Sequence, residues 1–349
     1  MDTDRFTQLL RKYAELTVKI GLNLQPGQRL IILTPLVAVD LVREITEIAY
    51  QIGCRLVSVI WVDEQLSLIR FQSAPRDSFE EYSAWEANGL LEFLDRGDAL
   101  LQIYGGDPDL LKGQDPELIG LVNRNRQKMN APISAHISAS NVNWAAIAIP
   151  NESWAMKVFP GVAVGQALAQ LWDAVFNVCR LNEPDPVAAW RQHIDGLTKR
   201  SDYLNRKHYT ALHFMAPGTD LTIGLPAGHL WVSGATRSKR GIAFTANVPT
   251  EEVFTVPHKD QTQGFVTASK PLSYRGSLIQ NFRLTFDQGR VVALSAEKGE
   301  AELRKIIEAD ENAGRLGEVS LVPDQSPISQ SGLIFYNTLF DENAADHIA

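Results

Sequence analysis

The chain contains only two cysteines, Cys54 and Cys179, among its 349 residues. A disulfide scaffold or a cysteine-based zinc ribbon needs more, so both are disfavoured, and two buried free thiols are expected. The sequence also lacks an apolar run long enough to cross a bilayer. Its first residues, Met1–Asp4, lack the basic and apolar regions of a signal peptide. These absences predict a cytoplasmic protein without a membrane partner.

The chain also has fewer basic than acidic residues. It contains 33 Lys and Arg and 41 Asp and Glu, which gives a net charge of -8. Proteins that bind nucleic acid usually carry a basic stripe on one face. Such a stripe is missing here, so we predict no nucleic-acid partner. An acidic surface instead favours cationic partners, such as molecules with a free amino group.

Several catalytic motifs are missing as well. The chain has no His-Glu-x-x-His pair, no Gly-x-Ser-x-Gly elbow, no Walker loop and no Gly-x-Gly-x-x-Gly fingerprint. The segment Gly105-Gly106-Asp107 follows an apolar run and has two interpretations, a binding loop or an ordinary strand-to-helix turn. The turn is favoured, because glycine and aspartate are common turn residues. We therefore assign no cofactor-binding loop.

Apolar runs alternate with helical patterns over the first 207 residues. The predicted strands are 29–33, 55–62, 99–104, 132–138 and 144–149. The predicted helices are 6–20, 37–53, 64–72, 79–95, 164–181 and 187–206. This alternation predicts an α/β domain with a parallel sheet covered on both faces.

Short strand-like runs replace this pattern after residue 207. They cover 210–215, 220–223, 230–233, 243–248 and 264–268, and are followed by a hairpin at 281–296 and a helix at 300–313. A chain of 349 residues usually has more than one core. We predict an N-terminal α/β domain at 1–207 and a strand-rich α+β domain at 208–349.

Carboxylates and histidines gather in three segments of the second domain. Glu251 and Glu252 precede His258, Glu318 opens an apolar strand, and His347 follows three acidic residues. Carboxylates and neutral imidazole suit zinc, cobalt and manganese. In a strand, neighbouring side chains point to opposite faces, so at most one of the two adjacent glutamates faces a given cavity. Spacing alone still favours structural roles, with solvated or capping glutamates and a histidine on a surface helix.

The same segments resemble the aminopeptidase T and aminopeptidase S family of metallopeptidases. The motifs that carry the resemblance are Asn247–Asp260, Ser269–Gly276, Leu316–Pro323 and Ser326–His347, with Lys12–Leu16 and Leu22–Gln28 near the N-terminus. Together they reach across essentially the whole chain. Several long motifs in the family's order are far more specific than one short pattern.

The resemblance implies that the chain hydrolyses N-terminal amino acids from short peptides with a free N-terminus. It implies two divalent metal ions per subunit, zinc or cobalt with magnesium as a third option, and a homodimer. Glu252 corresponds to the first ligand and is preferred over Glu251. Glu318 corresponds to the carboxylate that bridges both metals and serves catalysis, and His347 corresponds to an imidazole ligand. His258 is either an outer contact of this site or part of a turn.

The sequence also departs from the family pattern. Family members continue beyond the segment of His347 with a catalytic tyrosine and a His-x-Asp element, whereas this sequence ends at Ala349, within an expected helix. The comparison predicts a catalytic domain that is incomplete at its C-terminus. One alternative is therefore a catalytically impaired peptide-binding or assembly module on the same scaffold. Another is a different metal-dependent amidase or hydrolase.

Overall fold

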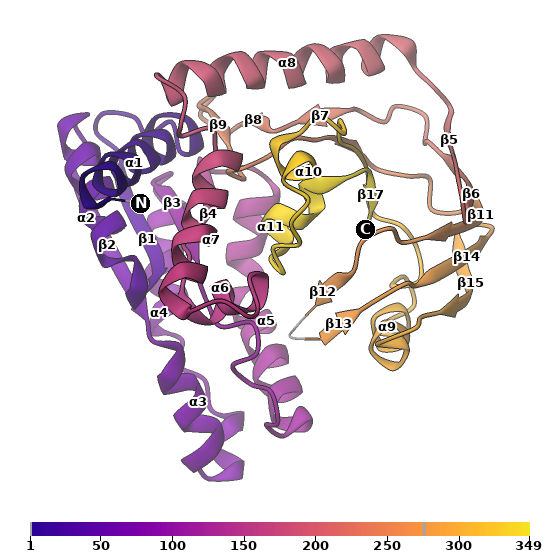
Figure 1. Ribbon diagram of the computed structural model, residues 1–349, viewed down its shortest axis with the longest axis horizontal. Helices are drawn as coiled ribbons and strands as arrows, with labels where there is room; N and C mark the ends of the chain where they lie inside the picture. The colour runs from indigo at the N-terminus through magenta and orange to yellow at the C-terminus, as the bar shows by residue number, and fades with distance from the viewer. Residues whose placement is uncertain (1, 275–276) are drawn as a thin grey trace. The chain divides into compact units, whose positions relative to one another are not determined.

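The computed structural model describes residues 2–274 and 277–349, which fall into two compact units (Figure 1). Unit 1 comprises Met1–Gln192 and Ala235–Pro249, and unit 2 comprises His193–Gly234 and Thr250–Ala349. The first boundary between the two units lies inside helix α8, Pro186–Lys207, whereas the predicted domain boundary lies at the end of that helix. The domain boundary itself stays a proposal.

A four-stranded parallel sheet forms the centre of unit 1, in the order β2-β1-β3-β4. Its strands are β1 (Arg29–Pro35), β2 (Leu56–Val62), β3 (Ala99–Tyr104) and β4 (Trp144–Ala148). The helices of this part of the chain are α1 (Thr3–Leu16), α2 (Val39–Gln51), α3 (Glu64–Ser73), α4 (Trp85–Asp95), α5 (Pro116–Ser138), α6 (Glu152–Val158) and α7 (Val164–Val178). The predicted parallel α/β fold is confirmed.

Both faces of this sheet are covered, because side chains alternate between the faces of each strand. On one face, Ile31 and Leu100 form a core cluster with Leu90 and Phe93 of α4. On the other face, a Cβ added to Gly21 would lie only 3.2 Å from the Cβ of Ala145. Helical segments therefore approach the sheet from both sides, as the apolar strands require.

The strand predicted at 132–138 is wrong, because these residues form the end of helix α5. The segment contains Pro132, which favours a break, but the helix continues through it. Its apolar residues follow a helical spacing, since Ile133 and Ile137 both pack with the α4 cluster. Four-residue spacing places two side chains on one helical face, and tertiary packing here overrides the local signal.

The segment 235–249 returns to unit 1 and forms hydrogen bonds with the edge of its sheet. It contains the antiparallel pair β8 (Ala235–Arg237) and β9 (Ala243–Thr245). Beyond β9, the amide of Ala146 donates to the carbonyl of Ala246 at 2.7 Å, and the amide of Val248 donates to the carbonyl of Ala146 at 3.0 Å. These bonds join the segment to strand β4.

Unit 2 is rich in strands, as predicted. One sheet has the order β15-β14-β11-β6-β5 and a second has the order β17-β16-β10-β7. The strands are β5 (Ala211–Ala216), β6 (Thr219–Gly224), β7 (Val232–Ser233), β10 (Val253–Thr255), β11 (Thr262–Thr267), β12 (Leu272–Tyr274), β13 (Ser277–Ile279), β14 (Arg283–Asp287), β15 (Arg290–Ser295), β16 (Val319–Leu321) and β17 (His347–Ile348). Its helices are the part of α8 from His193 onward, α9 (Glu300–Ile307), α10 (Pro327–Ser331) and α11 (Thr338–Asp341).

The hairpin predicted at 281–296 is confirmed by β14 and β15, whereas helix α9 is shorter than the predicted 300–313. The last two residues of the motif Ser269–Gly276 lie outside the described residues. Within the described part of the chain, no helix is both long enough and apolar enough to cross a bilayer.

Candidate metal centre

Three strands of unit 2 assemble the segments that carry the predicted ligands. Strand β16 pairs with β10 on one side and with β17 on the other, both antiparallel. In this register Ser320 lies opposite Phe254 in β10 and opposite His347 in β17. Glu252 directly precedes β10 and Glu318 directly precedes β16, so hydrogen bonding between these strands brings the distant segments together.

The three predicted ligands Glu252, Glu318 and His347 lie in one cluster. Each offers one ligand atom, and these atoms all lie within 4.8 Å of one another. The Nε2 atom of His347 is 3.2 Å from Oε2 of Glu252 and 3.3 Å from Oε1 of Glu318. The exposed fraction of the side chain is 9% for Glu252, 19% for His347 and 33% for Glu318. Glu318 is therefore the member that solvent reaches most easily.

Two further contacts orient these side chains. The hydroxyl of Ser320, which is fully buried, donates to Oε2 of Glu252 at 2.5 Å. The Nδ1 atom of His347 lies 3.3 Å from the carbonyl of Ala345, which leaves Nε2 facing the two carboxylates. Sequence reasoning missed Ser320, although its position two residues after Glu318 in a strand places both on one face. Outer contacts of this kind commonly orient metal ligands in proteins.

The cluster has the electrostatics of a cation site. Burial lowers the pKa of His347, but hydrogen bonds to Glu252 and Glu318 outweigh burial and raise this pKa to about 10. The imidazole is therefore protonated at neutral pH, and its single positive charge offsets only part of the negative charge of the two carboxylates. A divalent cation supplies positive charge at the same place, and two carboxylates with one imidazole suit zinc or cobalt. The residues present therefore fit a divalent metal ion.

A third carboxyl group, that of Glu342, interacts with this cluster. Glu342 opens a short 3₁₀ turn after α11. Burial raises its pKa to about 7, and repulsion from Glu252 and Glu318 adds to the rise. Sequence reasoning named the acidic segment but gave Glu342 no role. Asp346 of the same segment accepts the amide of Val322 at 2.8 Å, which is a structural contact.

Glu251 lies outside the cluster, in line with the expectation that adjacent glutamates point apart. Its side chain is 2% exposed, and one carboxylate oxygen lies 3.6 Å from Nε2 of His193. Its amide donates to Oδ1 of Asn343 at 2.7 Å. His258 takes part in a turn, because its ring nitrogen Nδ1 accepts the amide of Asp260 at 3.2 Å.

The helix expected at the end of the sequence is wrong. Helix α11 ends at Asp341 and a 3₁₀ turn follows at Glu342–Ala344. His347 then lies in strand β17, where it pairs with Ser320. The pairing with β16 fixes the backbone of His347 beside Glu318. A surface helix would not have placed the imidazole between two carboxylates.

A parallel α/β unit and a strand-rich unit with a carboxylate–imidazole cluster together define a metalloenzyme scaffold. The family model described as thermophilic metalloprotease (M29) matches residues 6–349. Aminopeptidase 2 of Geobacillus stearothermophilus is 46% identical over 346 residues, which cover 99% of this chain and 84% of that protein. Aminopeptidase AmpS of Bacillus subtilis is 44% identical over 346 residues, with the same coverage.

A solved structure shows the same fold. Wild-type AmpT from Thermus thermophilus superposes with a TM-score of 0.94 and 42% sequence identity, and the match covers 99% of this chain and 85% of that one. The chain belongs to the thermophilic metalloprotease (M29) family. This membership confirms the predicted resemblance and the predicted enzyme class, that of the metalloaminopeptidases.

Proposed function

We propose that this protein removes N-terminal amino acids from short peptides, with divalent metal ions held by Glu252, Glu318 and His347. The convergence of these three side chains within 4.8 Å carries the proposal. The names of the relatives support it, because Aminopeptidase 2 and Aminopeptidase AmpS are each similar to this chain along almost its whole length.

Each residue of the cluster has a distinct role in this proposal. Divalent ions bound there supply a Lewis acid that activates water and polarises the scissile carbonyl. Glu252 is the most buried member and is held by Ser320, so it serves as a fixed ligand. Glu318 is one-third exposed and would hold the metal ions from the solvent side of the cluster. His347 must lose the proton that it holds in the metal-free cluster before its Nε2 can bind a metal.

The charge of the region also bears on the kind of substrate. The region concentrates three acidic groups, those of Glu252, Glu318 and Glu342. Each of them makes it less favourable to bring another negative charge to this place. A protonated amino terminus suits such a place better than a carboxylate or a blocked amide. We therefore propose selectivity for peptides whose N-terminus is free.

The decisive experiment measures the release of free amino acids from matched short peptides with free and acetylated N-termini. The purified protein is assayed after chelation, and again with added zinc or cobalt. We expect release only from the unblocked peptides and only with metal. Glu318→Gln should lose this activity, whereas Glu311→Gln, whose parent side chain is 88% exposed, should keep it.

Two outcomes would overturn the proposal. Equal cleavage of blocked peptides would indicate another metal-dependent amidase or hydrolase. Firm metal binding without any cleavage would favour the peptide-binding or assembly module.

The proposal of two metal ions per subunit is tested by elemental analysis after dialysis, with zinc, cobalt and magnesium offered separately. A homodimer and a cytoplasmic location are also proposals, which light scattering and cell fractionation test.

A further inference from the structure

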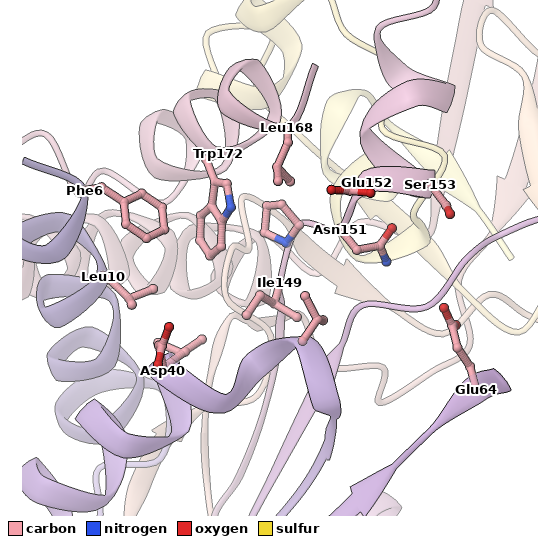
Figure 2. Close-up of a pocket in the computed structure, with 13 residues that line it drawn as sticks. Phe6, Leu10, Asp40, Glu64, Ile149, Asn151, Glu152, Ser153, Leu168 and Trp172 are labelled. Atoms are coloured by element: carbon pink, nitrogen blue, oxygen red, sulfur yellow. The ribbon is translucent and has the colours of Figure 1, made fainter. Parts of the chain in front are cut away.

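A cavity of about 470 Å³ opens in unit 1 at the carboxyl edge of the parallel sheet (Figure 2). Part of its lining comes from the segments that directly follow three strands: Val37 after β1, Glu64 after β2 and Ile149–Ser153 after β4. Strand β2 lies on one side of β1, and β3 and β4 lie on the other. The connections therefore reverse direction between β1 and β3, and ligands of open parallel sheets commonly bind outside the carboxyl ends at such a reversal.

The cavity has an apolar part and an acidic rim. Figure 2 shows Phe6, Leu168 and Trp172 together on one side, from helices α1 and α7. The rings of Phe6 and Trp172 meet edge to face, with their centroids 5.0 Å apart. In the same view Glu152 lies beside Leu168, and Glu64 lies farther to the lower right, away from Phe6 and Trp172. A ligand in this cavity would therefore contact apolar surface against Phe6 and Trp172 and would meet carboxylates toward the other end.

The turns around the rim are tied to one another, so the cavity is preformed. The carboxylate of Glu64 accepts the amide of Asp107, in the turn after β3, at 2.8 Å. The side chain of Asn151 donates to the carbonyl of Gly105 at 2.5 Å. A Cβ at Gly105 would lie 2.4 Å from Cγ2 of Ile149, so only glycine permits this close approach. A preformed cavity binds a ligand without first having to order its own loops.

Charge selects the class of ligand. Three carboxylates line the cavity, those of Asp40, Glu64 and Glu152, and the 13 lining residues include no lysine, arginine or histidine. Asp40 pairs with Arg43 at 3.1 Å, and both side chains are largely exposed, so this pair is weak. Glu64 and Glu152 leave a net negative rim beside an aromatic surface. Aromatic faces and carboxylates both attract organic cations.

We propose that this cavity is a binding site for an amphipathic primary amine, a protonated amino group attached to an apolar group. The apolar group lies against Phe6 and Trp172, and the ammonium lies toward the rim that carries the carboxylates of Glu64 and Glu152. All residues that line this site belong to unit 1. The proposed binding function is separate from the peptidase activity proposed for unit 2.

The test measures binding of phenethylamine by isothermal titration calorimetry in the presence of a chelator. Its neutral counterpart 2-phenylethanol has nearly the same shape and serves as the matched ligand. We expect the alcohol to bind at least about tenfold more weakly, because a charge-assisted hydrogen bond is roughly twice as strong as a neutral one. Equal affinity for the two ligands, or no binding of either, would overturn the proposal.

Variants locate the binding. Val37 is 51% exposed and lines the cavity, whereas its neighbour Leu36 is 49% exposed and does not line it. Val37→Arg should abolish binding, and Leu36→Arg should change the affinity by less than about threefold, since one exposed charge has a modest effect. Glu64→Gln keeps an oxygen that can accept the amide of Asp107 and should weaken binding about fivefold. Glu86→Gln, on exposed surface of α4, should leave the affinity unchanged.

A further variant separates this site from the metal centre. Glu318→Gln, which should abolish peptidase activity, must leave phenethylamine binding intact. If Glu318→Gln abolishes binding while Val37→Arg does not, the amine occupies the metal centre and the proposal for unit 1 is wrong. The peptidase assay is read separately, so failure of one proposal does not imply failure of the other.

Discussion

The two units build their candidate sites in different ways. In unit 1 four strands of five to seven residues run parallel, and the cavity lies in the turns beyond their carboxyl ends. In unit 2 the candidate ligands lie at the ends of strands β10, β16 and β17, which have only two or three residues each. A site in turns depends on the loops around it, whereas the ligand cluster depends on strand register. Damage to the ligands should therefore affect metal chemistry, and damage to the core of unit 1 should not.

The largest effect is expected from Glu318→Gln. The variant keeps the size of the side chain but removes the charge of the most exposed ligand. We expect peptidase activity to fall by more than about a hundredfold and metal affinity to fall with it. The measurements are amino acid release and metal titration, with Glu311→Gln as the control. If metal stoichiometry and activity are unchanged, Glu318 is not part of the metal site.

The pH dependence of metal affinity should be the next largest effect. The pKa of His347 is about 10 in the metal-free fold, so a metal ion must displace a proton at neutral pH. The logarithm of the affinity should therefore rise by at least about one per pH unit between pH 6 and 8, because Glu342, whose pKa is about 7, also loses its proton in this range. Titration at several pH values in two buffers of different ionisation enthalpy gives the number of protons released. A metal affinity that does not change with pH would contradict a protonated His347 in the metal-free cluster.

The same raised pKa fixes the sign of a stability effect. In the metal-free protein, the ion pairs of His347 stabilise the fold fully below its unfolded pKa of about 6.5. This stabilisation is lost as the pH rises through about 10. Chemical denaturation of the metal-free protein should therefore show decreasing stability across this window. His347→Gln removes the titrating group and should flatten the profile, whereas His213→Gln, on exposed surface, should not.

A smaller effect is expected from Ser320→Ala. Without the hydroxyl, Glu252 loses the hydrogen bond that holds its Oε2 atom, while the ligands themselves stay in place. Metal affinity should fall about tenfold, as it does when outer contacts of other metal sites are removed. Ser233→Ala, in β7 on the far side of β10, is the matched control. If the two variants bind metal equally well, the hydroxyl does not position Glu252.

These contrasts also show how far the sequence could predict the molecule. The strands of unit 1 were evident because each is a mostly apolar run, and Ala99–Tyr104 agrees in both bounds. The end of α5 was missed because a proline within a short apolar run looks like a strand boundary. Which strands pair is a tertiary property that local patterns do not encode.

The members of the candidate metal cluster could be named from the sequence, but its geometry could not. Glu252, Glu318 and His347 came from resemblance to a family, since spacing alone favoured structural roles for all three. Ser320 and Glu342 became evident only when the register of β16 and the turn after α11 were known. Their effects depend on distances across strands, which no short motif contains. The cavity of unit 1 was missed for the same reason, because its lining comes from α1, α7 and several turns.

The smallest effect on the metal centre is expected from a change in the core of unit 1. The side chain of Tyr13 is fully buried, and its hydroxyl donates to the carbonyl of Ala148 at 3.0 Å at the end of β4. Tyr13→Phe leaves that carbonyl without this donor, which should reduce the free energy of unfolding by about 1–2 kcal/mol. Denaturant unfolding measures this loss, and metal titration of the same variant should give an unchanged affinity. A weakened metal affinity would show that the two units share one folding equilibrium, because unit 1 would then set the stability of a site that lies wholly in unit 2.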